Sequence, residues 1–225
     1  MSLLDIAIGW VAPAECLSCG AEGAALCEPC IYSEIIPYGE NCWNCNARSP
    51  GGRTCQKCRL PGTPRYVWLT TTYEGAAKSL IKVYKFGNLR TASETIGSMM
   101  AETLRNFNGD QDYLVVPIPT ATSRIRERSF DHCSLLAKEI TKNLGLKYLP
   151  ALGRLGQQRQ VGKSRQDRLE QLDDKFYLKY NLVKGQHVLL IDDVVTTGGT
   201  LRAATKILRD GGAAQVDALV FAKRL

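Results

Sequence analysis

The sequence predicts an α/β protein in which a small cysteine-rich zinc module precedes a doubly wound, mostly parallel sheet. Two observations carry this prediction. Eight of the nine cysteines form four pairs of one spacing near the N-terminus, and strand-like and helical patterns alternate after them. The 225 residues suffice for one ordinary domain and one small module. Two prolines and a glycine punctuate residues 60–64, so we place the module at residues 1–62 and the α/β domain at residues 63–225.

Composition excludes two classes of protein. With 44% hydrophobic and 23% charged residues, the chain is typical of a folded domain and not of a disordered one. No run approaches the roughly 18 apolar residues that span a bilayer, so membrane insertion is not expected. The apolar start lacks the basic segment of a signal peptide, and Leu4, Ile8 and Val11 have helical spacing. We therefore expect a short amphipathic turn there and a cytoplasmic protein.

The clustered cysteines have the spacing of zinc ligands. Two residues between two thiolates form a tight knuckle that aims both sulfurs at one ion, and two knuckles complete a tetrahedral four-cysteine site. Four knuckles therefore predict two structural Zn²⁺ ions, which would supply folding energy to a module with little apolar core. Gly20 follows the first knuckle, where a positive φ is often needed. The predicted ligands are Cys16, Cys19, Cys27, Cys30, Cys42, Cys45, Cys55 and Cys58.

Disulfides and redox chemistry are the competing interpretations of these cysteines. A reducing cytoplasm disfavours disulfides, and the repetition of a single spacing favours metal. Spacing does not decide whether the knuckles pair in sequence or cross over, although the short gaps between them favour sequential pairing. The ninth cysteine, Cys133, stands apart and is expected to be a buried core residue.

The first half of the α/β domain alternates strand and helix. Residues 66–73 are β-branched and aromatic, which favours a strand, and residues 76–85 and 91–106 follow with helical periodicity. Residues 113–119 form an apolar run that ends in prolines, as a buried strand would. Residues 129–144 place apolar side chains at helical spacing and predict the next helix.

The next segment of the domain contains less regular structure. Residues 146–149 and 176–178 predict two short strands. Between them we expect a long loop over residues 153–163 and a short charged helix over residues 164–172.

The end of the chain predicts one further strand–helix–strand unit. Residues 187–192 form a continuous apolar strand, which is typical of a parallel sheet covered on both faces. A helix over residues 200–209 ends at two glycines, and residues 216–222 form the last strand. In such sheets, ligands bind beyond the carboxyl ends of the strands.

Two aspartates and a turn of threonine and glycine follow the strand over residues 187–192. Adjacent carboxylates at a strand end can bind sugar hydroxyls, a Mg²⁺ ion or both. The turn presents backbone N–H groups at a helix N-terminus, where anions bind, and glycines let the backbone approach a phosphate. A dinucleotide fingerprint would place its glycines before the acids, and a Walker A motif would need a lysine. The candidate residues are Asp192, Asp193, Val194, Val195, Thr196, Thr197, Gly198, Gly199 and Thr200.

Residues 188–200 as a whole resemble the phosphoribosyl-pyrophosphate (PRPP) signature of type I phosphoribosyltransferases. An ordinary capped helix after a buried strand would not require this string. The resemblance implies a type I phosphoribosyltransferase-like sheet that binds PRPP with Mg²⁺. It also implies that Asp192 and Asp193, as the catalytic pair, hold the ribose 2′- and 3′-hydroxyls, and that residues 196–200 wrap the 5′-phosphate.

Five motifs follow one another along the chain: the four knuckles, residues 82–87, residues 116–119, residues 126–132 and the signature. Their order resembles the ComF family of competence and DNA-utilisation proteins over essentially the whole chain, with the N-terminal module as a double zinc ribbon. The family usually has Arg-Gly-Phe-Asn-Gln where this chain has residues 128–132, so a glycine and two amides are absent. Its Gln–Leu-Ser–Arg segment is also weakened here, at residues 160–168.

The resemblance also assigns two loops. Residues 117–123 would hold the diphosphate, and a flexible loop near residues 154–168 would close over the reacting centre. Basic side chains in this loop could neutralise a leaving diphosphate, and a solvated charged surface is the alternative. Lys85 is either a ligand group or a charge at a helix C-terminus. The basic loop residues are Arg154, Arg159, Lys163, Arg165 and Arg168.

Two functions follow from this resemblance. One is a ComF-like role in DNA uptake and natural transformation, with PRPP or a related ribose phosphate, single-stranded DNA and DNA-uptake proteins as partners. The alternative is an active Mg²⁺-dependent phosphoribosyltransferase in nucleotide metabolism or salvage, with an unidentified acceptor. In the first of these functions, Trp68, Tyr66 or Tyr84 could stack on the bases of single-stranded DNA if their side chains are exposed.

Charge divides the chain in the same way as the cysteines. The formal net charge is +7, with −2 on residues 1–60 and +9 on the rest. Eight zinc-bound thiolates and two Zn²⁺ ions would bring the chain to about +3 and the N-terminal part to about −6. Anion binding is therefore expected on the α/β domain and not on the zinc module.

Overall fold

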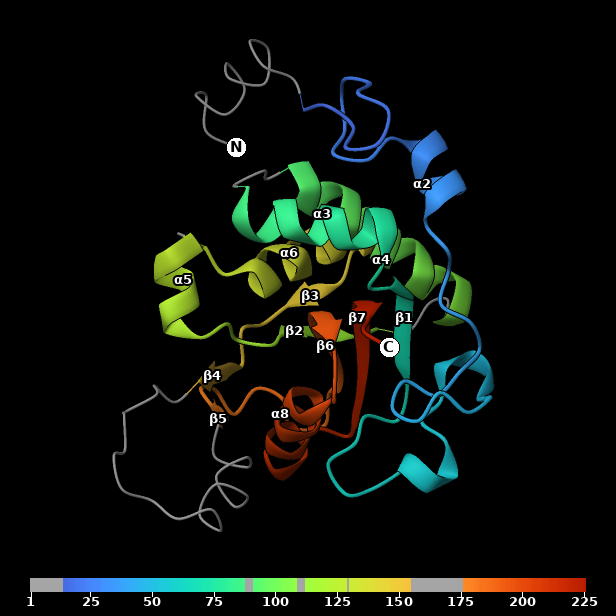
Figure 1. The fold of residues 1–225 in the computed structure, drawn as a ribbon. Helices are drawn as coiled ribbons and strands as arrows, with labels where there is room; N and C mark the ends of the chain where they lie inside the picture. The colour runs from blue at the N-terminus through green and yellow to red at the C-terminus, as the bar shows by residue number, and fades with distance from the viewer. Residues whose placement is uncertain (1–13, 88–90, 109–111, 129, 155–175) are drawn as a thin grey trace, which may run out of the picture.

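The centre of the molecule is a five-stranded parallel sheet. Its strands are β1 (Val67–Thr72), β2 (Leu114–Pro117), β3 (Lys147–Tyr148), β6 (His187–Val195) and β7 (Gln215–Lys223). They lie in the order β1-β7-β6-β2-β3, and each pair is parallel. The computed structural model describes residues 14–87, 91–108, 112–128, 130–154 and 176–225 (Figure 1).

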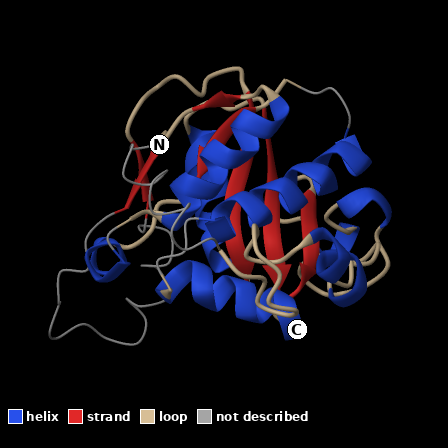
Figure 2. Cartoon of the chain, turned by 90° about the horizontal axis from the view of Figure 1, so that it is seen from above, coloured by secondary structure: helices blue, strands red, loops and turns tan. Residues whose placement is uncertain are grey.

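Helices cover both faces of this sheet. The helices α3 (Gly75–Phe86), α4 (Thr91–Asn108) and α6 (His132–Leu144) lie above it in Figure 1, and α8 (Gly199–Asp210) lies below it. Figure 2 shows the strands with helices on either side. The predicted α/β class and the doubly wound, parallel sheet are therefore confirmed. No helix among the described residues is long and apolar enough to cross a membrane.

The middle strand β6 is buried on both faces. Leu189 and Ile191 belong to the core on the side of α3, α4 and α6, while Val188 and Leu190 belong to the core on the side of α8. Because successive side chains of a strand point to opposite faces, both sets are apolar and the sequence reads as one continuous run. This burial fixes the position of β6, whose carboxyl-terminal half contains Asp192 and Asp193 of the signature.

The segment before α6 differs from the prediction. Residues 129–144 were expected to form one helix, but α6 begins at His132 and a separate helix α5 (Thr122–Arg128) precedes it. Asp131 caps α6, since its side chain accepts a hydrogen bond from the Ser134 backbone N–H at 3.2 Å. The predicted diphosphate loop over residues 117–123 therefore includes the first two residues of α5.

A second, antiparallel pair of strands lies apart from the main sheet. It consists of β4 (Leu152–Arg154) and β5 (Phe176–Leu178). The expected strand over residues 176–178 is confirmed, while the loop expected from residue 153 begins inside β4. The expected helix over residues 164–172 lies outside the described residues, as do Arg159, Lys163, Arg165 and Arg168 and the turn expected near the N-terminus.

The N-terminal module runs along the β1 edge of the sheet (Figure 1). Pro37 pairs with Thr71, and Arg53 pairs with Tyr66, so the module contacts this edge through isolated bridges. The boundary at residue 62 falls between the module's last short helix and β1, and the division into two domains stays a prediction. The module's helices are α2 (Glu28–Glu34) and the 3₁₀ turns η1 (Pro50–Gly52) and η2 (Gln56–Cys58).

Candidate functional site

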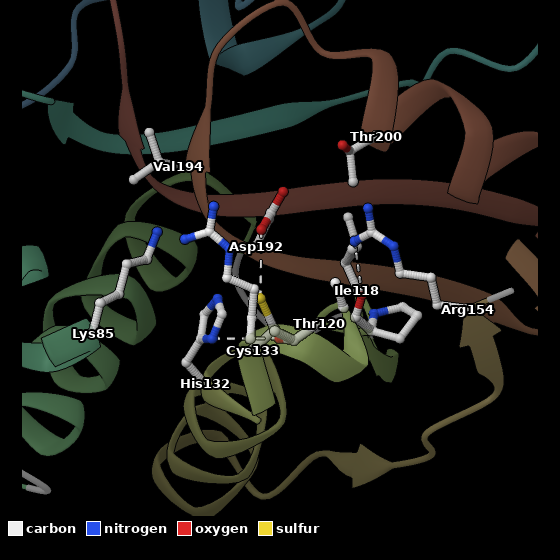
Figure 3. A pocket seen from close by; sticks show the side chains of 12 residues that line it. Lys85, Ile118, Thr120, His132, Cys133, Arg154, Asp192, Val194 and Thr200 are labelled. Atoms are coloured by element: carbon white, nitrogen blue, oxygen red, sulfur yellow. Dashed lines mark hydrogen bonds between the residues drawn. The ribbon is translucent and has the colours of Figure 1, made fainter. Parts of the chain in front are cut away.

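A cavity of about 310 Å³ lies at the carboxyl end of the sheet (Figure 3). It collects side chains from the ends of β2, β4 and β6 and from α3, α5, α6 and α8. Parallel sheets bind ligands at this end, so the cavity lies where the fold predicts a site. The residues that line it are Lys85, Ile118, Pro119, Thr120, Ala121, Arg124, His132, Cys133, Arg154, Asp192, Val194 and Thr200.

The signature loop forms a second, smaller hollow of about 40 Å³ beside this cavity. Asp192, Val194 and Thr200 line both hollows, so the two adjoin. The smaller hollow lies at the N-terminus of α8, where Gly198 is the N-cap with φ +73°. Backbone N–H groups at a helix N-terminus have no intrahelical partner and attract anions. The predicted residues 194–200, together with Asp192 and Leu201, line this smaller hollow, which we call the cradle.

Two basic side chains hold the loop from outside. The Lys223 ammonium donates to the Thr196 carbonyl at 2.7 Å, and the Arg202 guanidinium donates to the Thr197 carbonyl at 2.8 Å. Because C=O and N–H point in opposite directions across a trans peptide, these contacts turn the following N–H groups away from the two cations. Lys223 is buried, and this burial lowers its pKa. The loop is therefore anchored on its carbonyl side.

The two aspartates of the signature have different environments. Asp192 is half-buried and lines both hollows. Asp193 is buried, and its Oδ2 lies 2.7 Å from the Lys85 ammonium and 2.9 Å from His132 Nε2. Asp192 Oδ1 accepts a hydrogen bond from the Asp193 backbone N–H at 2.9 Å and faces the Cys133 thiol at 3.5 Å. Of the pair, Asp192 lines the two hollows and Asp193 does not.

These environments separate the two carboxyl pKa values. Burial, together with the negative charge of Asp193, raises the pKa of Asp192 to about 7. Burial acts in the same direction on Asp193. There, the hydrogen bond from His132 and the charge of Lys85 outweigh it and lower the pKa to about 2. Near neutral pH, Asp193 is a fixed anion, whereas Asp192 can exchange a proton.

His132 is the main functional candidate that sequence reasoning missed. It lines the cavity, holds Asp193 and lies 3.4 Å from Thr120 Oγ1 through its Nδ1 atom. The resemblance to the ComF family leads one to expect an amide at this position, and the departure to histidine was a signal that could have drawn attention to it. Lys85, for which two roles were open, both lines the cavity and pairs with Asp193. Thr120 and Arg124 of the cavity wall were not singled out individually either.

The other predicted residues have different outcomes. Arg154 lines the cavity and donates to the Pro119 carbonyl at 3.4 Å. Cys133 is buried as expected, and burial raises the pKa of its thiol. Trp68 and Tyr84 are buried core residues, so the exposure that base stacking needs is absent at both. Tyr66 is half-buried and stacks on Trp68 with ring centroids 5.6 Å apart.

The eight clustered cysteines converge in two groups. Within each group the four sulfur atoms lie within 4.8 Å of one another, and the grouping follows the sequence, as the short gaps favoured. Sulfur atoms are 3.6 Å apart between Cys19 and Cys27, and 3.5 Å apart between Cys45 and Cys55. Four sulfurs at about 2.3 Å from one ion would be about 3.8 Å apart, so both groups suit structural zinc. We call Cys16, Cys19, Cys27 and Cys30 cluster 1, and Cys42, Cys45, Cys55 and Cys58 cluster 2.

The first knuckles of both clusters turn through a left-handed residue. Gly20 has φ +75° in cluster 1, as expected, and Asn46 takes the equivalent place in cluster 2 with φ +61°. Asparagine tolerates this region better than most other side chains, which explains why the Cys42/Cys45 knuckle does not need a glycine. In each knuckle the turn closes with a backbone hydrogen bond of 2.9 Å, from Gly20 to Cys16 and from Asn46 to Cys42.

The clusters pack on opposite faces of the sheet. Cys16 and Cys30 join the core on the side of α3, α4 and α6, whereas Cys42 and Cys58 join the core on the side of α8. Trp43, between two ligands of cluster 2, is buried in this second core. Cluster 2 therefore lies on the same side of the sheet as the helix that follows the signature loop.

Comparisons with known proteins show what the chain is similar to. The model of the family described as phosphoribosyl transferase domain matches residues 89–225. The competence protein ComFC of Streptococcus pneumoniae is 27% identical over 87% of this chain and 86% of its own length. ComFC of Bacillus subtilis is 30% identical over 64% of this chain and 58% of its own. These similarities show that the chain is homologous to the ComFC and ComF competence proteins.

Solved structures with detectable similarity include the glutamine PRPP amidotransferase of B. subtilis. It is 21% identical, with a TM-score of 0.43, over 58% of this chain and 26% of that chain.

Proposed function

The chain belongs to the phosphoribosyl transferase domain family, and on this premise we propose that it binds PRPP, or a related ribose phosphate, together with Mg²⁺. The 5′-phosphate occupies the cradle of residues 194–200, and the ribose lies against Asp192. The proposal rests on one observation. The two hollows adjoin at Asp192, Val194 and Thr200, so an anion cradle lies beside a sugar-sized cavity. The diphosphate occupies the part of that cavity lined by residues 118–121.

The residues present suit Mg²⁺. This ion prefers oxygen ligands and is usually held by one or two carboxylates together with substrate phosphates. Asp192 offers a half-buried carboxylate at the junction of the two hollows. When bound, Mg²⁺ would neutralise charge on the diphosphate oxygens. Lys85, Arg124 and Arg154 add positive charge to the cavity wall, while Asp193 stays paired to Lys85 and His132. The direct contact of Asp193 with ribose stays a prediction.

We further propose that the protein acts in DNA uptake and natural transformation, where it handles single-stranded DNA in the cytoplasm with DNA-uptake proteins. Its homologues named for competence support this role. The distribution of charge supports it too, because the net charge of +9 after residue 60 suits a phosphate backbone. The zinc module, with a net charge of −2 before metal is counted, is the less favourable surface.

The test compares Asp192→Asn with a matched control, Asp112→Asn. Asparagine keeps the Oδ1 acceptor that Asp193 N–H uses, and the Asp112 side chain is 79% exposed and paired only loosely with Lys147, at 3.8 Å. We expect Asp192→Asn to weaken Mg²⁺–PRPP binding at least tenfold in calorimetry, and Asp112→Asn to bind like the parent. A parent that fails to bind PRPP contradicts the pocket assignment. Loss of PRPP binding with unchanged transformation efficiency separates the pocket from the competence role.

An active transferase is the second candidate function. The larger cavity extends past Asp192 to Arg124 and Arg154, which leaves room for an acceptor beside the ribose. In this reaction the bond between C1 of the ribose and the diphosphate oxygen breaks, the diphosphate keeps the electron pair, and a lone pair of the acceptor forms the new bond. We expect acceptor-dependent release of diphosphate from PRPP that slows in Asp192→Asn. This candidate is contradicted if PRPP binds but no nucleobase or amine tested as acceptor releases diphosphate faster than spontaneous hydrolysis does.

A further inference from the structure

Cluster 2 brings an indole ring against the signature loop. Trp43 lies between the ligands Cys42 and Cys45 and is 1% exposed. Its six-membered ring lies against Gly198, the N-cap of α8, so closely that a methyl group added at Gly198 would come within 2.6 Å of Trp43 Cη2. Gly198 is thus required twice, by its positive φ and by the indole. Residues 43 and 198 are far apart in sequence, and no local sequence pattern predicts their contact.

A polar chain joins the same two regions. Arg202 donates to the Asn44 side-chain carbonyl at 3.3 Å and to the Thr197 backbone carbonyl at 2.8 Å. Its guanidinium also lies 5.7 Å from the centroid of the Trp43 ring, within the range of a cation–π contact. Asn44 in turn donates to the Cys58 sulfur at 3.2 Å. One arginine therefore connects a ligand of cluster 2 to the carbonyl side of the loop.

The indole itself is held in one orientation. Trp43 Nε1 donates to Thr54 Oγ1 at 2.9 Å, and this hydroxyl donates to the Pro64 carbonyl at 2.7 Å. Thr54 is fully buried, so these hydrogen bonds are shielded from water. A buried side chain with a fixed donor and packed neighbours is a rigid support, which a loop of glycine and threonine does not provide for itself.

We propose that Trp43 is a positioning residue for the phosphate-binding loop, and that cluster 2, but not cluster 1, sets the affinity of the loop for a phosphomonoester. The inference rests on the cradle assigned under the proposed function and deepens it. The indole and Arg202 hold the loop on its carbonyl side, so its N–H groups are arranged before the ligand arrives. Such preorganisation raises affinity because less ordering is needed on binding. Cluster 1 packs on the opposite face of the sheet, where Cys16 and Cys30 join the core on the side of α3, α4 and α6.

The first experiment compares Trp43→Phe with Trp68→Phe, because both indoles are buried and each donates one hydrogen bond. The probe is ribose 5-phosphate in calorimetry, with two zinc ions per chain confirmed in each variant. We expect Trp43→Phe to weaken binding about tenfold and Trp68→Phe to leave it unchanged. Binding should also change the fluorescence of the parent and of Trp68→Phe, but not of Trp43→Phe. Equal affinities in the parent and Trp43→Phe overturn the proposal.

A second-site test separates steric support from general stability. Gly198→Ala should weaken ribose 5-phosphate binding at least a hundredfold, because the methyl group meets the indole and the positive φ disfavours alanine. Phenylalanine is shorter than indole, so Trp43→Phe should partly restore binding to Gly198→Ala, although each substitution alone weakens it. A double variant that binds no better than Gly198→Ala contradicts the contact.

The zinc arm compares Cys45→Ser with Cys19→Ser, the exposed ligands at matching places in the two clusters. Each should lose one zinc ion, but only Cys45→Ser should lose affinity for ribose 5-phosphate. Equal losses overturn the role of cluster 2. Hydrogen exchange of the amides of residues 196–199 needs no ligand and should be faster in Trp43→Phe than in Trp68→Phe. If exchange responds but the parent binds no phosphomonoester, the proposed function fails while the support of the loop stands.

Discussion

At the scale of single residues, the half-buried carboxyl of Asp192 sets a pH dependence of stability. Its pKa is raised to about 7, so its proton binds more tightly in the folded chain than in the unfolded one. The stability that this proton gives is complete below about pH 4 and is lost as the pH rises through about 7. Asp192→Asn cannot ionise, so its stability advantage over the parent should grow by about 1 kcal/mol between pH 6 and pH 8.

Urea unfolding at pH 6, 7 and 8, with zinc in excess, measures this difference. Asp112→Asn serves as the control, because its side chain is 79% exposed and the substitution should give a difference independent of pH. A constant difference between Asp192→Asn and the parent across this range contradicts the raised pKa.

Substitutions of His132 test its pairing with Asp193. His132→Ala would leave the buried Asp193 carboxylate with Lys85 alone, and losing a hydrogen-bond partner of a buried charge costs about 1–3 kcal/mol. His132→Gln can still donate a hydrogen bond to Asp193 from its amide. We expect thermal unfolding to show a clear loss of stability in His132→Ala and a much smaller one in His132→Gln. Similar losses in both variants would show that the ring fills space and does not hold the carboxylate.

At the scale of elements, the sequence predicts best where burial is two-sided. The run over β6 could be assigned because both faces are covered, and the cradle because its glycines and threonines follow a strand directly. The start of α6 was predicted wrongly because α5, which precedes it, is short and rich in arginine. It has no apolar face from which a separate helix could be predicted. His132 and Trp43 were missed because their partners, Asp193 and Gly198, are distant in sequence.

The true start of α6 makes a prediction at this scale. Asp131 accepts hydrogen bonds from the Ser134 N–H at 3.2 Å and from the Thr120 hydroxyl at 2.9 Å, and so joins the helix cap to the cavity wall. Asp131→Ala should lower the free energy of unfolding by about 1 kcal/mol, while Asp131→Asn, which keeps an acceptor, should lower it less. Urea unfolding of the two variants measures the difference. If alanine and asparagine behave alike, the cap contributes nothing.

At the scale of the whole molecule, zinc sharpens a division of charge that the sequence already contains. The two sulfur clusters suit two ions, and eight thiolates with two Zn²⁺ ions would make the first sixty residues about −6 against +9 for the rest. The module is nevertheless continuous with the domain in packing, because each cluster shares a core with one face of the sheet. A charged surface and a structural support are therefore combined in one small segment.

This division predicts where single-stranded DNA binds. On α5, Arg124 and Arg126 are exposed next to the cavity, whereas Arg48 and Lys57 are exposed on the zinc module. Each phosphate contact contributes about 0.7 to the slope of log affinity against log salt for single strands. Arg124→Gln/Arg126→Gln should therefore weaken binding and reduce this slope by about 1.4, and Arg48→Gln/Lys57→Gln should change neither quantity. Fluorescence anisotropy of a labelled oligonucleotide across a salt series measures both, and the reverse order of effects would place DNA on the zinc module.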